Sequence, residues 1–120
     1  MKIKPGAIGL LKFPNTDLNP GKLRPVLVVK KPPENKEDLI VCAITSQLNY
    51  YNPDWNELIT TQDEDFKKSG LKTTSIIRNF KMATIHESVI EGFIGEISNE
   101  RLLNIYRKYT EFFANKNEKQ

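Results

Sequence analysis

The chain of 120 residues contains one cysteine, one histidine and one tryptophan, and these scarcities exclude several classes of site. A lone Cys42 cannot build an intrachain disulfide framework or a cysteine metal centre. It lies in the apolar run Leu39–Ile44, so we expect it to be a small buried hydrophobe. No apolar run approaches the roughly 20 residues that a membrane helix needs, and no signal peptide is evident. We therefore expect a cytoplasmic protein with no membrane partner.

Patterns typical of metal and cofactor sites are also lacking. There is no glycine-rich phosphate loop and no cluster of ligands at metal-binding spacing, so we expect no metal and no cofactor. Glu34, Glu37 and Asp38 form a charge run rather than a paired acid–base site. His86 lies in a late strand-like segment, where a structural or surface role is favoured over catalysis.

The composition indicates one globular domain. Apolar residues make up 38% of the chain and charged residues 28%, which is typical of a folded rather than a disordered protein. We expect a single domain over residues 1–114 and a polar, frayed tail over residues 115–120. The net charge of +3 suits an acidic or nucleic-acid partner without demanding one.

Short strand-like segments fill most of the chain and are followed by one helix. Apolar residues at three- and four-residue spacing after a Ser98 N-cap predict an amphipathic C-terminal helix. Gly70 is expected to end a single helical turn over residues 63–69. The expected strands cover residues 7–13, 24–31, 38–45, 58–61, 73–80, 83–90 and 92–97, with the 73–80 and 83–90 segments paired. This pattern predicts a mainly β fold, a small barrel with a C-terminal helix.

Arg24 and Thr45 are the residues most suited to chemistry. Pro25 is read as the first rung of a strand, which places Arg24 at its mouth. Thr45 and Ser46 end the next strand, so antiparallel pairing of the two strands brings them to the same rim as Arg24. A guanidinium fork with hydroxyl donors grips phosphate oxygens. Taken alone, the residues leave open a solvated Arg24 and a Thr45–Ser46 turn cap.

Three ordered blocks of the sequence resemble the PemK/MazF-like toxins. The first pairs the Pro5-Gly6 turn and Phe13-Pro14 with Arg24–Val28, the second is Cys42–Gln47, and the third joins Ser69–Lys72 to Ser75–Arg78. Ala83–Ile85 and Ile94–Ser98 resemble the family's closing strands, so the resemblance covers residues 5 to 113. One departure is Ala7, where many members carry an acidic residue.

The resemblance implies an SH3-like PemK/MazF/CcdB-type barrel that forms a homodimer. It also implies the toxin of a type II toxin–antitoxin system: a ribosome-independent, sequence-selective, metal-independent endoribonuclease (an mRNA interferase). The family's catalytic arginine and threonine fall on Arg24 and Thr45. The partners implied are single-stranded mRNA and a cognate antitoxin with a disordered segment that folds across the toxin.

Such an enzyme cuts RNA by attack of the 2′-hydroxyl, which leaves a 2′,3′-cyclic phosphate and a 5′-hydroxyl. Donors placed at the phosphoryl oxygens stabilise the charge that gathers there. Arginine stays protonated and is a poor base, so we assign Arg24 to electrostatic stabilisation and name it as a candidate proton donor. We assign no general base.

RNA contacts are expected from polar residues around the two strand ends and in the third block. The expected RNA-binding residues are Asn15, Thr16, Lys22, Ser46, Gln47, Ser75 and Arg78. Tyr50, Tyr51 and Trp55 either stack bases or pack against a dimer mate, and the sequence does not separate these roles.

Two other functions belong to different classes. Inhibitors of DNA gyrase share the barrel, but they use an apolar, tryptophan-bearing C-terminus. This chain ends in the polar residues 117–120, and its only tryptophan is Trp55, which argues against gyrase inhibition. The third alternative is a catalytically silent barrel that binds RNA or protein.

Overall fold

A computed structural model of the chain describes residues 2–12 and 22–116. Two sequence expectations fall outside these ranges: the greater part of the Pro14–Lys22 loop, and the end of the polar tail at residues 117–120. The strands are β1 (Ala7–Leu11), β2 (Arg24–Lys30), β3 (Asp38–Thr45), β4 (Glu57–Ile59), β5 (Ser75–His86) and β6 (Gly92–Glu96). The helices are α1 (Phe66–Ser69) and α2 (Asn99–Ala114), with short 3₁₀ turns η1 (Leu48–Tyr50) and η2 (Glu87–Val89).

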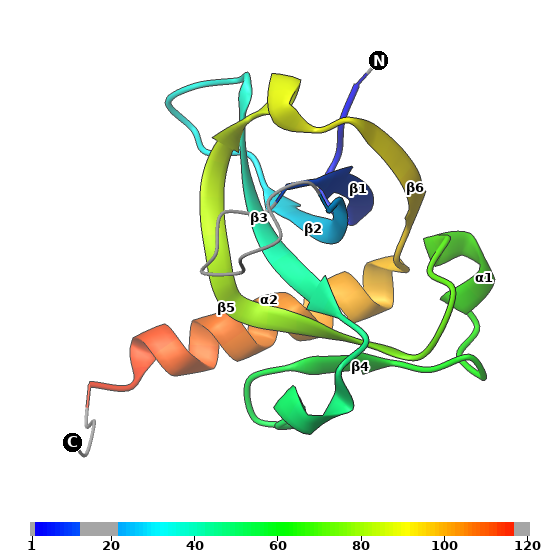
Figure 1. The fold of residues 1–120 in the computed structure, drawn as a ribbon. Coiled ribbons are helices and arrows are strands. Elements are labelled where there is room, and N and C mark those ends of the chain that lie inside the picture. Colours follow the sequence, from blue (N-terminus) through cyan, green and yellow to red (C-terminus); the bar gives the residue numbers. More distant parts are fainter. Residues whose placement is uncertain (1, 13–21, 117–120) are drawn as a thin grey trace.

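The strands form one antiparallel sheet in the order β4-β5-β3-β2-β1-β6. The sheet curls strongly, so that β6 at one edge and β4 at the other are both near α1, and α2 runs along one side of the curl (Figure 1). This is the mainly β barrel with a C-terminal helix that the sequence predicts.

Two apolar clusters lie on opposite faces of the sheet. One joins the sheet to α2: Leu27, Cys42 and Ile77 pack with Ile105 and Tyr109. The other lies on the opposite face and contains Leu11, Val26, Val28, Leu39 and Val41, with Ile90 and Phe93 packed against them. Because successive side chains of a strand point to opposite faces, β2 and β3 contribute to both clusters. Their unbroken apolar runs are thereby explained.

Two glycines let α1 approach β6 closely. Gly70 caps α1 in the left-handed conformation (φ +75°), as the sequence predicts. A Cβ atom on Gly70 would lie 2.1 Å from the Ile94 carbonyl oxygen, and one on Gly95 would lie 2.2 Å from the Lys68 carbonyl oxygen. Both contacts are with backbone, so neither position has room for a side chain.

The α2 helix begins as the sequence predicts. The Ser98 hydroxyl accepts a hydrogen bond from the Arg101 N–H at 3.1 Å. The helix is fixed to the sheet by two tyrosines: Tyr106 donates to the Val29 carbonyl at 2.5 Å, and Tyr109 donates to the Asn79 carbonyl. Among residues 2–12 and 22–116, no helix is long and apolar enough to cross a membrane.

The expectation of two paired strands over residues 73–80 and 83–90 is wrong. Ser75–His86 is one strand, β5, and both of its halves pair with β3. The register shifts between Cys42 and Ala43, whose partners are Met82 and Arg78, so residues 79–81 bulge out of the ladder. A bulge interrupts the apolar alternation in the same way as a turn does, which is why the sequence suggested a hairpin.

Candidate functional site

Arg24 and Thr45 meet at one end of the sheet. The register of β2 and β3 pairs Val26 with Ala43 and Leu27 with Cys42. Continued by two residues, the same register sets Arg24 opposite Thr45. Directly opposite residues project from the same face with Cβ atoms about 4.5–5.5 Å apart. Both residues are half-buried, at the first position of β2 and the last of β3.

The Thr45 hydroxyl is held by the turn that follows the strand. Its oxygen accepts a hydrogen bond from the Gln47 N–H at 3.1 Å. A hydroxyl that accepts in this way keeps its hydrogen as a donor to a ligand. Lys22, Ser46 and Gln47 are exposed beside the two strand ends. The structure thus brings five of the sequence-predicted site residues to one rim.

Arg78 extends this site along the same face. Ile76 of β5 is the partner of Thr45, and Arg78 stands two residues further on, opposite Ala43. Diagonal neighbours of this kind lie about 7–8 Å apart on the same face. The Arg78 guanidinium lies over the Tyr50 ring, 4.1 Å from its centroid.

Ser75 is the one remaining predicted RNA-binding residue that the structure describes. Ser75 is 4% exposed, and its hydroxyl donates to the Thr73 carbonyl at 2.9 Å. Its side chain is therefore committed to the local turn. Asn15 and Thr16 lie outside the described residues.

His86 is far from Arg24 and Thr45, in keeping with the structural role expected for it. It pairs with Asp38 at the opposite end of β3 from Thr45, which at strand rise is about 23 Å away. The ring Nδ1 accepts from the Ser88 N–H at 3.1 Å, and Nε2 lies 3.8 Å from a Glu37 carboxylate oxygen. These contacts close a surface turn.

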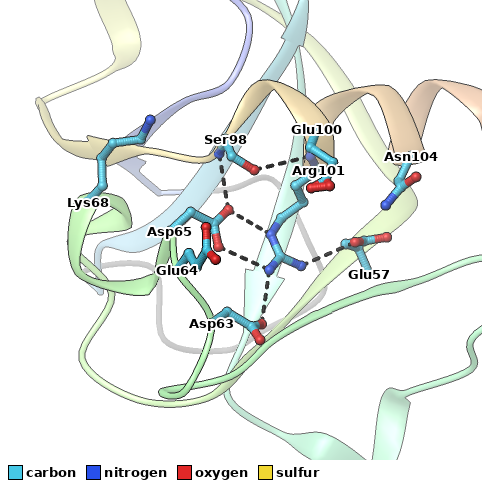
Figure 2. Close-up of a pocket in the computed structure, with 9 residues that line it drawn as sticks. All are labelled: Glu57, Asp63, Glu64, Asp65, Lys68, Ser98, Glu100, Arg101 and Asn104. Atoms are coloured by element: carbon cyan, nitrogen blue, oxygen red, sulfur yellow. Dashed lines mark hydrogen bonds and ion pairs between the residues drawn. The ribbon is translucent and has the colours of Figure 1, made fainter.

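A cavity of about 500 Å³ lies beside the N-terminal half of α2 and shares no lining residue with the Arg24–Thr45 rim (Figure 2). At its wall the Arg101 guanidinium binds both oxygens of Asp65, through Nε at 2.8 Å and Nη2 at 3.0 Å. Nη2 also donates to Asp63 at 2.9 Å, and Nη1 donates to Glu57 at 3.1 Å. The cluster joins β4 and the α1 segment to α2, so we assign these ion pairs to stability rather than to catalysis.

The carboxylates of this cluster have lowered pKa values. Burial alone raises the pKa of Asp65, but hydrogen bonds from Arg101 and from the Ser98 N–H outweigh it and lower the pKa from 3.8 to about 2. The Thr60 N–H and the Arg101 guanidinium lower the pKa of Asp63. The pKa of Arg101 is raised, because its carboxylate partners outweigh the effect of burial. All three groups are therefore held in their charged forms.

The Arg101 cluster had no signal in the sequence. Its partners are 36 to 44 residues away along the chain, and Arg101 occupies an ordinary helical position. Nor did local patterns indicate Asn56, Phe80 and Lys81, which join Tyr50, Trp55 and Arg78 around a cavity of about 220 Å³. Only the nearby aromatic residues gave a hint of it.

Among residues 2–12 and 22–116, no group of three or more His, Cys, Asp or Glu side chains is placed to hold a metal ion. The chemical groups gathered at the Arg24–Thr45 rim are a guanidinium, hydroxyls, an amide and an ammonium group. All of these donate hydrogen bonds, and two are cations, so the rim suits a phosphodiester anion.

Comparisons with known proteins identify the family and the fold. Residues 4–113 match the family described as the PemK-like, MazF-like toxin of type II toxin–antitoxin systems. No curated protein sequence matches significantly.

Among solved structures, the Mycobacterium tuberculosis toxin MazF-mt6 is similar at a TM-score of 0.65 and 17% identity, covering 92% of this chain and 97% of that one. An endoribonuclease from a mycobacterial species has a TM-score of 0.67 and 13% identity, covering 98% and 97%. The MazE–MazF structure from Deinococcus radiodurans has a TM-score of 0.67 and 15% identity, covering 94% and 96%. At these identities the likeness shows the shared fold. Because the family match spans nearly the whole sequence, the chain belongs to the PemK-like, MazF-like toxins of type II toxin–antitoxin systems.

Proposed function

We propose that this toxin is an endoribonuclease that cuts single-stranded mRNA, independently of the ribosome and at selected sequences. Two solved structures of the same fold carry the name endoribonuclease, one from a mycobacterial species and one in complex with its cognate antitoxin. The observation that carries the proposal is the register of β2 and β3, which sets Arg24 and Thr45 opposite each other on one face. With mRNA as the substrate, we place the reaction in the cytoplasm.

The reaction fits the groups at the rim. The 2′-hydroxyl of the RNA gives up its proton to solvent as its oxygen attacks the adjacent phosphorus, and the bond from phosphorus to the 5′-oxygen breaks. The 5′-oxygen takes up a proton from solvent, so the products are a 2′,3′-cyclic phosphate and a 5′-hydroxyl. The nucleophile is part of the substrate, so the step requires neither a protein nucleophile nor a metal-activated water. The protein's task is to stabilise negative charge on the phosphoryl oxygens, commonly the largest catalytic contribution of an enzyme.

Arg24 and Thr45 take complementary roles in this step. The Arg24 guanidinium binds two phosphoryl oxygens through parallel charge-assisted hydrogen bonds. The Thr45 hydroxyl donates to one of them, and its own position is fixed by the Gln47 N–H. The Arg24 guanidinium also directs an N–H toward the departing 5′-oxygen and, because it stays protonated, stabilises the negative charge that develops there.

RNA lies along the rim and is held by the exposed residues on either side. Lys22, Ser46 and Gln47 contact the backbone next to the scissile phosphate. Asn15 and Thr16 keep the RNA-binding role expected from the sequence, although they lie outside the described residues. We leave Ser75 out of the RNA contacts, because its hydroxyl is buried and bonded to Thr73.

The test is to incubate the purified protein with a long RNA in EDTA and map the cleaved ends. We expect cuts at a small set of sequences, each leaving a 5′-hydroxyl and a 2′,3′-cyclic phosphate. A second RNA in which the cut positions carry 2′-deoxyribose serves as the control and should remain intact. Cleavage of that control, or products with 5′-phosphate ends, would rule out the proposed mechanism.

We also propose a homodimer and a cognate antitoxin as partners. One solved structure of this fold is an endoribonuclease from a mycobacterial species in complex with its cognate antitoxin. The antitoxin should carry a disordered, partly acidic segment that covers the Arg24 rim. Co-expression with the product of the neighbouring gene should suppress RNA cleavage, and light scattering should give twice the mass of one chain. Undiminished cleavage would refute the antitoxin assignment.

A further inference from the structure

The cavity around Trp55 and Arg78 has the features of a nucleobase site. It measures about 220 Å³ and is lined by Tyr50, Trp55, Asn56, Arg78, Phe80 and Lys81. Ligand pockets for whole drug-sized molecules occupy about 300–1,000 Å³, so this one suits a single ring system. We propose that it holds one unpaired base of the RNA beside the scissile phosphate, an inference that rests on the proposed function.

The walls of the cavity are aromatic and accessible. Trp55 is 49% exposed and Tyr50 is 43% exposed, which is unusual for rings of this size unless they contact a partner. Bases of single-stranded nucleic acids stack on such rings and on arginine guanidinium planes. Arg78 already lies over the Tyr50 ring at 4.1 Å, so a guanidinium and an indole face the same space.

The charge of its lining residues distinguishes this cavity from the one beside Arg101. Arg78 and Lys81 line it, and no carboxylate does. The charged residues that line the cavity beside Arg101 are two basic ones, Lys68 and Arg101, and five acidic ones: Glu57, Asp63, Glu64, Asp65 and Glu100. A polyanion is attracted to the first and repelled by the second. Charge therefore favours RNA as the occupant of the Trp55 cavity.

The cavity is held in shape by the polypeptide that forms it. Asn56 is 4% exposed, and its side-chain amide donates to the Tyr50 carbonyl at 3.3 Å. The Asn56 N–H donates to the Asn52 carbonyl at 2.8 Å, and its own carbonyl accepts from Lys108 at 2.5 Å. Asn56 thus ties the loop that carries Tyr50 and Trp55 both to itself and to α2. Because the loop is already ordered, binding a base costs little conformational entropy.

The position of the cavity fits a nucleotide next to the cut. Arg78 is the diagonal neighbour of Thr45 on the same face of the sheet, about 7–8 Å away. A phosphate held between Arg24 and Thr45 therefore has a stacking site within reach of an adjoining base. Base choice at that position would then depend on the cavity, which makes Trp55 and Arg78 specificity-determining residues.

Trp55 is the only tryptophan in the chain, so its fluorescence reports on the cavity directly. The probe is a short single-stranded oligonucleotide that contains a mapped cut site and carries 2′-O-methyl groups, which prevent cleavage. We expect saturable quenching of Trp55 fluorescence at the concentration where the labelled oligonucleotide's anisotropy rises. Binding by anisotropy with unchanged Trp55 fluorescence would overturn the inference while leaving the nuclease proposal intact.

Variants test the same point by affinity. Trp55→Ala should weaken oligonucleotide binding about 5- to 150-fold, the loss of one stacked base, while Trp55→Phe should retain most of it. The matched control is Tyr51→Ala: Tyr51 is 41% exposed in the same loop but lines a different cavity with Glu57 and Glu111. Equal binding by all the variants, or a change of oligomeric state in Trp55→Ala with unaltered RNA affinity, would show that the cavity has another occupant.

Discussion

At the scale of single residues, Thr45 is the side chain with the most specific proposed role. Its oxygen accepts the Gln47 N–H, so the direction of its O–H is restricted before any RNA binds. An arginine alone would not fix the position of a phosphate, because its long side chain can bind the anion in several positions. The threonine adds a second, fixed donor, which is the kind of preorganisation that lowers a barrier in the transition state.

Replacing Thr45 by valine should therefore slow cleavage by about 100-fold, the usual effect of removing one oxyanion donor. Valine retains the branched shape of threonine and loses only the hydroxyl. Thr45→Ser keeps the hydroxyl and should retain activity within about tenfold of the wild type. Initial rates on a labelled RNA measure both variants. Equal rates for valine and threonine at this position would remove the hydroxyl from the mechanism.

Cys42 provides a residue-scale test that is independent of function. Burial raises the pKa of its thiol to about 12, so the reactive thiolate is scarce at neutral pH. We expect no alkylation of Cys42 by iodoacetamide at pH 8 in the folded protein and rapid alkylation in urea, measured by mass spectrometry. Fast labelling without denaturant would show that the face between β3 and α2 is open to solvent.

At the scale of elements, the strands that carry the site were the most predictable. The run from Asp38 to Thr45 was predicted with the bounds that the structure has, because its apolar centre is unbroken and polar residues flank it. Arg24 begins β2, as expected for the 24–31 segment. The reading of Pro25 as the first rung is wrong, because Pro25 is the second residue of β2 and is paired with Leu10 of β1. The juxtaposition of Arg24 and Thr45 then follows from antiparallel pairing alone.

Elements whose form depends on distant contacts were not predictable. The β5 bulge at residues 79–81 has the local appearance of a turn, and only the pairing with β3 shows otherwise. The Trp55 cavity likewise needs Arg78 and Lys81 from β5 to meet an aromatic loop that precedes them by more than twenty residues. Local patterns carry no information about such meetings.

The contact between α1 and β6 depends on two glycines. Gly95→Ala would bring a methyl group onto the Lys68 carbonyl, and Gly70→Ala would add strain at φ +75°. We expect each to lower the free energy of unfolding by at least about 2 kcal/mol, measured by urea denaturation.

Gly92→Ala is the control for these variants, because no atom lies within 4 Å of a Cβ there. It should change the free energy of unfolding by less than about 0.5 kcal/mol. If the Gly95 variant were as stable as the Gly92 variant, α1 and β6 could not be in the close contact described.

At the scale of the whole molecule, charge is distributed unevenly. Carboxylates gather around Arg101 beside α2, whereas Arg24, Arg78 and Lys81 lie on β2 and β5. The net charge of +3 understates this polarity. If RNA is the substrate, as we propose, we expect this charge distribution to steer it toward the cationic strands.

The Arg101 cluster also makes stability depend on pH. The pKa of Asp65 is about 2 in the folded protein against 3.8 for the free side chain, so the unfolded chain takes up a proton first as the pH falls. The contribution, about 2 kcal/mol, is complete above about pH 5 and is lost between about pH 5 and 1, most of it between about pH 4 and 2.

Asp65→Asn should remove this part of the pH dependence and lower stability at pH 7, since it leaves the Arg101 guanidinium without its two-point partner. The exposed neighbour Glu64→Gln is the matched control and should leave the stability profile unchanged. Urea denaturation across pH 2 to 7 measures all three proteins. A wild-type profile that is flat between pH 4 and 2 would refute the role of Asp65.

The proposed cleavage mechanism depends on Arg24 acting at the scissile phosphate. The single-turnover cleavage rate of Arg24→Ala tests this role most directly. The residue stands at the half-buried start of β2, so the variant should keep the wild-type melting temperature within a few degrees. We expect its cleavage rate to fall by at least about 100-fold in EDTA, with Lys22→Ala as a nearby control that mainly weakens RNA binding. A folded Arg24→Ala protein that cuts RNA at the wild-type rate would contradict the proposed mechanism.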